Sequence, residues 1–85
     1  MAEILYFSTA QCGPCKILKP IVQQVATETG RHVTYIDAEA SPDLALRYNV
    51  RKVPTIIVSD NGNIIYQHSG NLSKQQLASL FNNYR

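Results

Sequence analysis

The amino-acid sequence predicts an α/β protein with a four-stranded mixed sheet that helices cover on both faces. Short apolar runs rich in β-branched residues alternate with longer segments whose apolar residues recur at helical spacing. The last two apolar runs are separated only by a turn. The predicted element order is therefore β-α-β-α-β-β-α. Because 85 residues provide for only one core, we expect residues 1–85 to form a single domain.

The first three predicted elements form a β-α-β unit. Residues 3–8 are a nearly continuous apolar run, which is typical of a strand buried on both faces. Pro14 suits the first turn of the next helix, Pro20 should kink that helix without ending it, and Gly30 is a natural stop. Residues 33–37 should form a second strand, parallel to the first because a helical crossover joins them. The apolar stripe of the helix consists of Ile17, Leu18, Ile21, Val22 and Val25.

A short helix and a third strand are predicted next. Ser41 is placed to cap the helix, Pro42 fits its first position, and the helix should end near residues 48–49. Residues 55–58 are rich in β-branched side chains and predict a strand. The first and third strands are both apolar on either side, so helices must cover both faces of the sheet.

A hairpin and a closing helix complete the predicted fold. Residues 60–63 predict a turn, and residues 64–68 a fourth strand antiparallel to the third. Ser73 with Gln76 three residues later is the pattern of a capping box at the start of a helix. The apolar stripe of this helix consists of Leu77, Leu80, Phe81 and Tyr84.

Composition and charge exclude several classes of protein. Hydrophobic residues make up 45% of the chain, which argues against disorder. The formal net charge is +2 and no run of lysines and arginines occurs, so we expect no nucleic-acid partner. No apolar stretch approaches the ~20 residues of a membrane-spanning helix. The first apolar run is too short for a signal peptide, and Glu3 precedes it. We therefore expect a cytoplasmic protein with no membrane partner.

The two cysteines of the chain, Cys12 and Cys15, are separated by only two residues. As a structural disulfide this pair would constrain little of the unfolded chain, because the loop that it closes is short. As part of a zinc site it would need two more ligands, and the two histidines, His32 and His68, are isolated. A redox pair remains, and a C-x-x-C pair near a β-α-β unit is typical of such motifs.

The predicted elements place Cys12 at the carboxyl end of a strand and at the amino end of a helix. A thiolate is the attacking species in disulfide exchange, and unpaired backbone N–H groups and the helix dipole stabilise a negative sulfur at this position. Cys15 lies one turn further along and should point back toward Cys12. We expect Cys12 to be exposed and to attack, and Cys15 to be shielded and to resolve the mixed disulfide.

Three segments carry a recognisable pattern: Cys12-Gly13-Pro14-Cys15-Lys16, Val53-Pro54-Thr55 and Gly70-Asn71-Leu72-Ser73-Lys74. Together they span nearly the whole chain, and in them the sequence resembles the thioredoxin family. The resemblance implies a minimal thioredoxin fold, a cis peptide bond before Pro54 facing the active-site disulfide, and a glycine loop before the last helix. It implies Cys12 and Cys15 as catalytic residues, with no metal and no cofactor other than their redox-active disulfide. The substrate-binding residues that it implies are Gly13, Pro14, Val53, Pro54 and Gly70.

The chain also departs from the family pattern. It begins at the strand that precedes the active site, without the usual amino-terminal strand and helix, and so resembles the glutaredoxin-sized thioredoxins of phages and some archaea. Gln11 stands where the family usually has a tryptophan, and Tyr6 where it usually has a buried aspartate. The lysine that pairs with that aspartate corresponds to Val33 here, so the buried ion pair is absent as a unit.

Three functions compete on these grounds. The first is a monomeric reductase of protein disulfides, whose dithiol is regenerated by an NADPH-dependent flavoenzyme, thioredoxin reductase, or by glutathione. The second is a disulfide oxidase or isomerase, or a glutaredoxin-like reductase, which would use the same chemistry at another potential. The third is a non-catalytic binding subunit that uses the fold as a scaffold. The resemblance favours the reductase, because Gly13-Pro14 is the pair that reducing members of the family carry.

Overall fold

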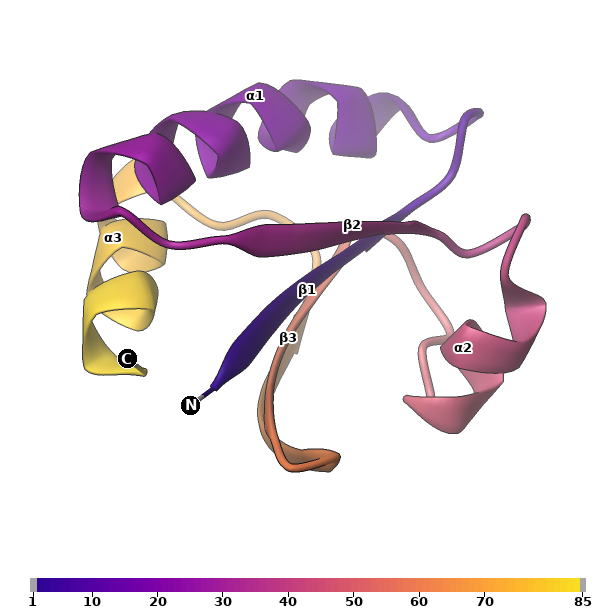
Figure 1. Cartoon of the computed structure of the whole chain (residues 1–85). Helices are drawn as coiled ribbons and strands as arrows, with labels where there is room; N and C mark the ends of the chain where they lie inside the picture. Colours follow the sequence, from indigo (N-terminus) through magenta and orange to yellow (C-terminus); the bar gives the residue numbers. More distant parts are fainter. Residues whose placement is uncertain (1, 85) are drawn as a thin grey trace.

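The computed structural model describes residues 2–84 of the chain. Within them the elements follow the predicted order β-α-β-α-β-β-α (Figure 1). Their bounds are β1 (Glu3–Ser8), α1 (Gly13–Thr29), β2 (Val33–Asp37), α2 (Pro42–Arg47), β3 (Thr55–Asp60), β4 (Asn63–Ser69) and α3 (Lys74–Asn83).

The four strands form one mixed sheet in the order β2-β1-β3-β4. β1 and β2 are parallel, as predicted for the β-α-β unit, and the other two pairs are antiparallel. Phe7 near the end of β1 pairs with Thr55 at the start of β3. The chain that leaves β1 toward the cysteines therefore lies at the same end of the sheet as the chain that enters β3.

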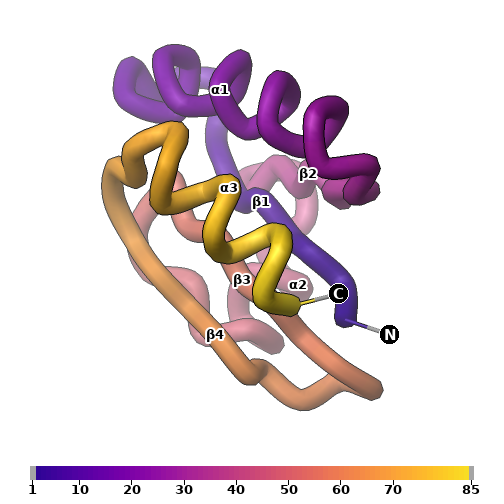
Figure 2. Tube along the Cα trace, turned by 90° about the vertical axis from the view of Figure 1, so that its left-hand side faces the viewer, coloured from indigo at the N-terminus to yellow at the C-terminus, as the bar shows by residue number. Residues whose placement is uncertain are grey.

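Helices pack on both faces of the sheet, as predicted. α1 and α3 cover one face and α2 covers the other (Figures 1 and 2). Along β1, Ile4 and Tyr6 point into the core beneath α1 and α3, whereas Leu5 and Phe7 point into the core beside α2. Alternate side chains of one strand thus enter two cores, which explains why β1 is apolar at every position.

Most predicted helix ends and faces are confirmed, but Ile17 is not on the buried face of α1. Leu18, Val22 and Val25 are buried, whereas Ile17 is 71% exposed. A helix turns by about 100° per residue, so Ile17 lies outside the sector that these three share. α1 does run through Pro20, and the kink there stays a prediction.

The helix caps agree with the predictions except at α2. Gly30 ends α1 in the left-handed conformation, with φ at 68°. Ser73 and Gln76 form both hydrogen bonds of a capping box at the start of α3. Ser41 precedes α2 as predicted, but its side chain makes no capping hydrogen bond. Asp37 instead organises the chain before α2, because its Oδ1 accepts from the amides of Glu39 and Ala40.

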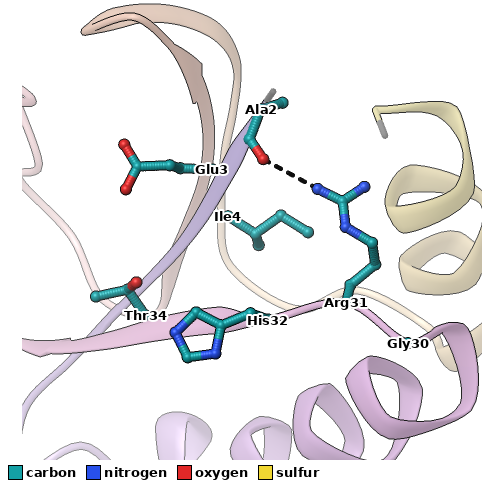
Figure 3. Close-up of a pocket in the computed structure, with 7 residues that line it drawn as sticks. All are labelled: Ala2, Glu3, Ile4, Gly30, Arg31, His32 and Thr34. Atoms are coloured by element: carbon teal, nitrogen blue, oxygen red, sulfur yellow. Dashed lines mark hydrogen bonds between the residues drawn. The ribbon is translucent and has the colours of Figure 1, made fainter.

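Arg31 joins three parts of the chain at the end of the sheet remote from the cysteines. Its Nη1 donates to the carbonyl oxygens of Phe81 and Tyr84, near the end of α3, and its Nη2 donates to the carbonyl oxygen of Ala2 at 3.0 Å. Figure 3 shows the guanidinium directed at Ala2, and Figure 2 shows α3 ending beside the start of β1. We call these contacts the Arg31 clamp.

Candidate active site

Cys12 and Cys15 form a disulfide at the start of α1. Cys12 is the N-cap of the helix, and its Sγ accepts a hydrogen bond from the backbone N–H of Cys15 at 3.1 Å. The first turn of α1 contains no acidic side chain. A thiolate formed at Cys12 on reduction would therefore face a backbone donor and the positive end of the helix dipole, with no carboxylate beside it in that turn.

The two sulfur-bearing residues differ in exposure. Cys15 is only 2% exposed, whereas Cys12 is half-buried. Gly13 and Pro14, which lie between them, are both exposed. An incoming disulfide can therefore approach Cys12 more readily than Cys15. The order of exposure is the one expected from the sequence, although Cys12 is half-buried rather than exposed.

The predicted substrate-binding residues outside this motif lie together. The Val53–Pro54 peptide bond is cis, and the amide of Gly70 donates to the carbonyl oxygen of Pro54 at 2.8 Å. Gly70 has a φ of 102°, a conformation that side-chain-bearing residues rarely adopt. Thr55 Oγ1 donates to the carbonyl of Lys52 at 2.6 Å and lies 2.8 Å from Ser69 Oγ. These contacts hold the cis-proline loop against the glycine loop, at the end of the sheet that carries Cys12.

Tyr6 contributes a contact to the site that the sequence did not predict. Its side chain is fully buried, as expected, and its hydroxyl donates to the carbonyl oxygen of Cys15 at 3.0 Å. The neighbour of Tyr6 on β2 is Tyr35, whose ring meets the Tyr6 ring edge-on at 5.9 Å, whereas Val33 pairs with Ile4. Burial, and to a lesser degree Tyr35, raises the pKa of Tyr6 to about 12. The hydroxyl therefore stays neutral at physiological pH.

Comparison with known proteins decides the family. The family model for thioredoxin matches residues 2–83.

The chain belongs to the thioredoxin family.

Two curated thioredoxins show the similarity in sequence. A thioredoxin of Buchnera aphidicola is 34% identical over 98% of this chain and 78% of its own length. A thioredoxin of Mycoplasma genitalium is 35% identical over 94% of this chain and 79% of its own length. Both alignments extend over nearly the whole of this chain, so the similarity is not confined to the cysteine motif.

Two solved thioredoxins show the same fold. A single-site mutant of a thioredoxin from Halobacterium salinarum superposes with a TM-score of 0.89, at 31% identity, over 98% of this chain and 74% of that one. Thioredoxin 1 from the thermophilic eubacterium Thermosipho africanus superposes with a TM-score of 0.83, at 27% identity, over 96% of this chain and 92% of that one. With the Cys12–Cys15 disulfide, these similarities show that the chain is a thiol–disulfide oxidoreductase with protein-disulfide reductase activity.

A cavity of about 320 Å³ lies beside the buried cysteine, Cys15. Its lining includes Cys15, Lys16, Lys19, Tyr35 and Asp37. The ammonium group of Lys19 lies 5.3 Å from the centre of the Tyr35 ring. The cavity thus opens beside Cys15 between α1 and β2, with charged side chains of both signs, Lys16, Lys19 and Asp37, in its lining.

A second cavity, of about 380 Å³, lies at the Arg31 clamp and contains neither cysteine (Figure 3). His32 lines it, and His32 is exposed. His68 is engaged elsewhere, with its Nε2 3.1 Å from the carbonyl oxygen of Asn71. Among residues 2–84 no three histidine, cysteine or acidic side chains gather as metal ligands, and none of the helices there is long and apolar enough to cross a membrane.

Proposed function

We propose that this protein reduces target disulfides through Cys12 as the attacking thiolate and Cys15 as the resolving thiol. The difference in exposure between the two cysteines carries this assignment. The Cys15 amide that faces Cys12 Sγ supports it, because a backbone donor favours the thiolate over the thiol.

The reaction consists of two exchanges. Cys12 Sγ, as thiolate, attacks one sulfur of the target disulfide, forms a mixed disulfide and releases the other target sulfur as a thiolate. Cys15 then loses its proton and attacks Cys12 Sγ, which forms the Cys12–Cys15 disulfide and releases the second target thiolate. Two electrons pass from the dithiol to the target, and both sulfurs come from one chain, so we propose a monomer as the active form.

The target segment docks beside the disulfide in this proposal. The docking surface consists of Gly13, Pro14, Val53 and Gly70, and Pro54, which is buried, supports it from beneath. Val53 is half-buried and directly precedes the cis-proline and β3, so in this proposal its backbone pairs with an extended target segment. The hydrogen bond from Gly70 to Pro54 supports this surface, since it holds the two loops in a fixed relation.

Regeneration of the dithiol requires an electron donor. We propose an NADPH-dependent thioredoxin reductase, with glutathione as the alternative donor, in a reducing cytoplasm. The use of both cysteines in one exchangeable pair supports this location, since proteins of oxidising compartments commonly carry disulfides that staple the fold.

Trapping with single-cysteine variants tests the division of roles. Cys15→Ser keeps the attacking sulfur but cannot resolve, so mixed disulfides with a protein substrate should accumulate on non-reducing gels. Cys12→Ser should capture no substrate, because the remaining sulfur is buried. If Cys12→Ser trapped substrate and Cys15→Ser did not, the two roles would have to be exchanged.

A further inference from the structure

Cys15 is held by hydrogen bonds at both of its backbone polar groups near the disulfide. Its N–H donates to Cys12 Sγ at 3.1 Å, and its carbonyl oxygen accepts from the Tyr6 hydroxyl at 3.0 Å. The second bond joins β1 to the first turns of α1, across nine residues of sequence. The position of the donor that faces Cys12 is thus tied to a side chain in the centre of the sheet.

The turn that follows Cys15 lacks one of the bonds that normally fasten a helix. Pro20 has no N–H, so it cannot donate to the carbonyl of Lys16, which is the next carbonyl after that of Cys15. The proline ring also crowds that carbonyl. The Tyr6 hydroxyl, which lies outside the helix, donates to the neighbouring carbonyl, that of Cys15. This bond offsets the missing Pro20 bond in the turn that holds the disulfide.

Packing alone does not account for a tyrosine at this position. A phenylalanine would fill the same space, and a buried hydroxyl destabilises a core unless it is hydrogen-bonded. The hydroxyl does not serve as a base, because burial raises the pKa of Tyr6 to about 12. What the hydroxyl does in this structure is hold Cys15.

We propose that Tyr6 is a positioning residue of the exchange reaction: its hydroxyl holds the Cys15 backbone so that the Cys15 amide is directed at Cys12 Sγ. The proposal rests on the roles of Cys12 and Cys15 proposed above. In the reduced protein the same amide would stabilise the Cys12 thiolate. Release of Cys15 from Tyr6 would weaken that stabilisation, and the pKa of Cys12 would rise.

Alkylation of the reduced protein by iodoacetamide, followed across pH, tests the proposal. In Tyr6→Phe the pH at which Cys12 becomes reactive should move upward, and the rate at neutral pH should fall several-fold, because only the thiolate reacts. The matched control is Tyr66→Phe, which removes the hydroxyl of a half-buried tyrosine on β4 and should leave the alkylation midpoint where the wild type has it.

A second control separates positioning from stability. Val25→Ala removes buried volume from the far half of α1 and keeps the Tyr6 hydroxyl, so it should lower the urea midpoint without moving the alkylation midpoint. A Tyr6→Phe midpoint equal to or below that of the wild type overturns the proposal. So does an upward shift that Val25→Ala reproduces at similar stability.

The proposed function is tested separately in the same preparation. If the wild-type protein failed to reduce a disulfide peptide, the function would be wrong. The alkylation midpoints would still report whether Tyr6 positions Cys15, since alkylation needs no disulfide substrate.

Discussion

At the scale of single residues, the surroundings of Cys15 differ from the pattern expected of the family. The position where a carboxylate is usual holds Tyr6, whose neutral hydroxyl donates to the Cys15 backbone. A neutral donor cannot take the proton that Cys15 must lose before it attacks. That proton must pass to water or to the departing thiolate, and the cavity that Cys15 and Lys19 line is an opening to solvent on that side.

The raised pKa of Tyr6 predicts that the folded protein loses stability at alkaline pH. Its pKa is about 12 in the folded protein against 10.0 as a free side chain, so the unfolded chain loses this proton first. The contribution of Tyr6 to the free energy of unfolding is therefore complete below about pH 10 and is lost as pH rises toward about 12, by about 2–3 kcal/mol in total.

Urea melts of the wild type and Tyr6→Phe check this contribution. Between about pH 8 and about pH 11 the wild type should lose more stability than the variant, because the variant has no proton to lose at this position. The other tyrosines are common to both proteins and cancel in the difference. Equal losses would mean that Tyr6 ionises as easily in the folded chain as in the unfolded one.

The sequence predicted part of this residue-scale arrangement. The pairing of Cys12 with Cys15 could be predicted because it depends only on local features. These are the spacing of the two cysteines, the start of the helix and the short loop that their disulfide closes. The interior position of Tyr6 followed from the apolar pattern of its strand. Its bond to Cys15 could not be predicted, because it depends on how α1 crosses the sheet above β1.

At the scale of elements, the two serines that precede helices behave differently. Ser73 accepts from the amide of Gln76 and so satisfies a free donor at the start of α3. Ser41 occupies the same position before α2, but its side chain makes no such bond. The sequence pattern indicated a cap at both. At Ser41 the backbone lacks the extended conformation of Ser73, with ψ at 65° against 159°. The Leu44 amide, which a Ser41 side chain would cap, donates instead to the Ser41 carbonyl oxygen at 3.2 Å.

This difference gives a paired prediction for stability. Ser73→Ala should lower the free energy of unfolding by about 1 kcal/mol, the usual loss for a helix cap. Ser41→Ala should change it by much less, because no side-chain bond is lost. Urea or thermal melts of both variants provide the measurement. A Ser41→Ala variant as unstable as Ser73→Ala would mean that Ser41 does cap α2 in solution.

Element boundaries were predictable where the pattern is local. β1 and β2 have the bounds that their apolar runs predicted, at residues 3–8 and 33–37. β3 extends past the predicted Val58 to Asp60, since pairing with β4 continues across a bulge there. Strand pairing, not the side-chain pattern, determines where this hairpin ends.

At the scale of the whole molecule, the sheet order assembles the site. The sequence predicted a parallel pair and an antiparallel hairpin, but not that β1 lies between β2 and β3. Local patterns do not encode which distant strand lies beside another. The pairing of Phe7 with Thr55 is nevertheless what brings the cis-proline loop to the end of the sheet that carries Cys12.

The Arg31 clamp predicts a measurable contribution to stability from one half-buried side chain. Arg31→Ala should lower the free energy of unfolding by about 1–3 kcal/mol, because it removes charge-assisted bonds to Ala2, Phe81 and Tyr84. Arg47→Ala, at the exposed end of α2, is the matched control and should change it by less than about 1 kcal/mol. Similar urea midpoints for the two variants would contradict the prediction.

The same clamp determines how the protein could be attached to something else. Ala2 and Tyr84 share one guanidinium, and β1, six residues long, spans about 20 Å at about 3.3 Å per residue before the chain leaves it toward the disulfide. A tether, a fusion partner or a solid support joined at Ala2 or at Tyr84 would therefore emerge from one small patch. Cys12, at the opposite end of β1, would stay open to incoming proteins, so an immobilised form should keep its rate of disulfide reduction.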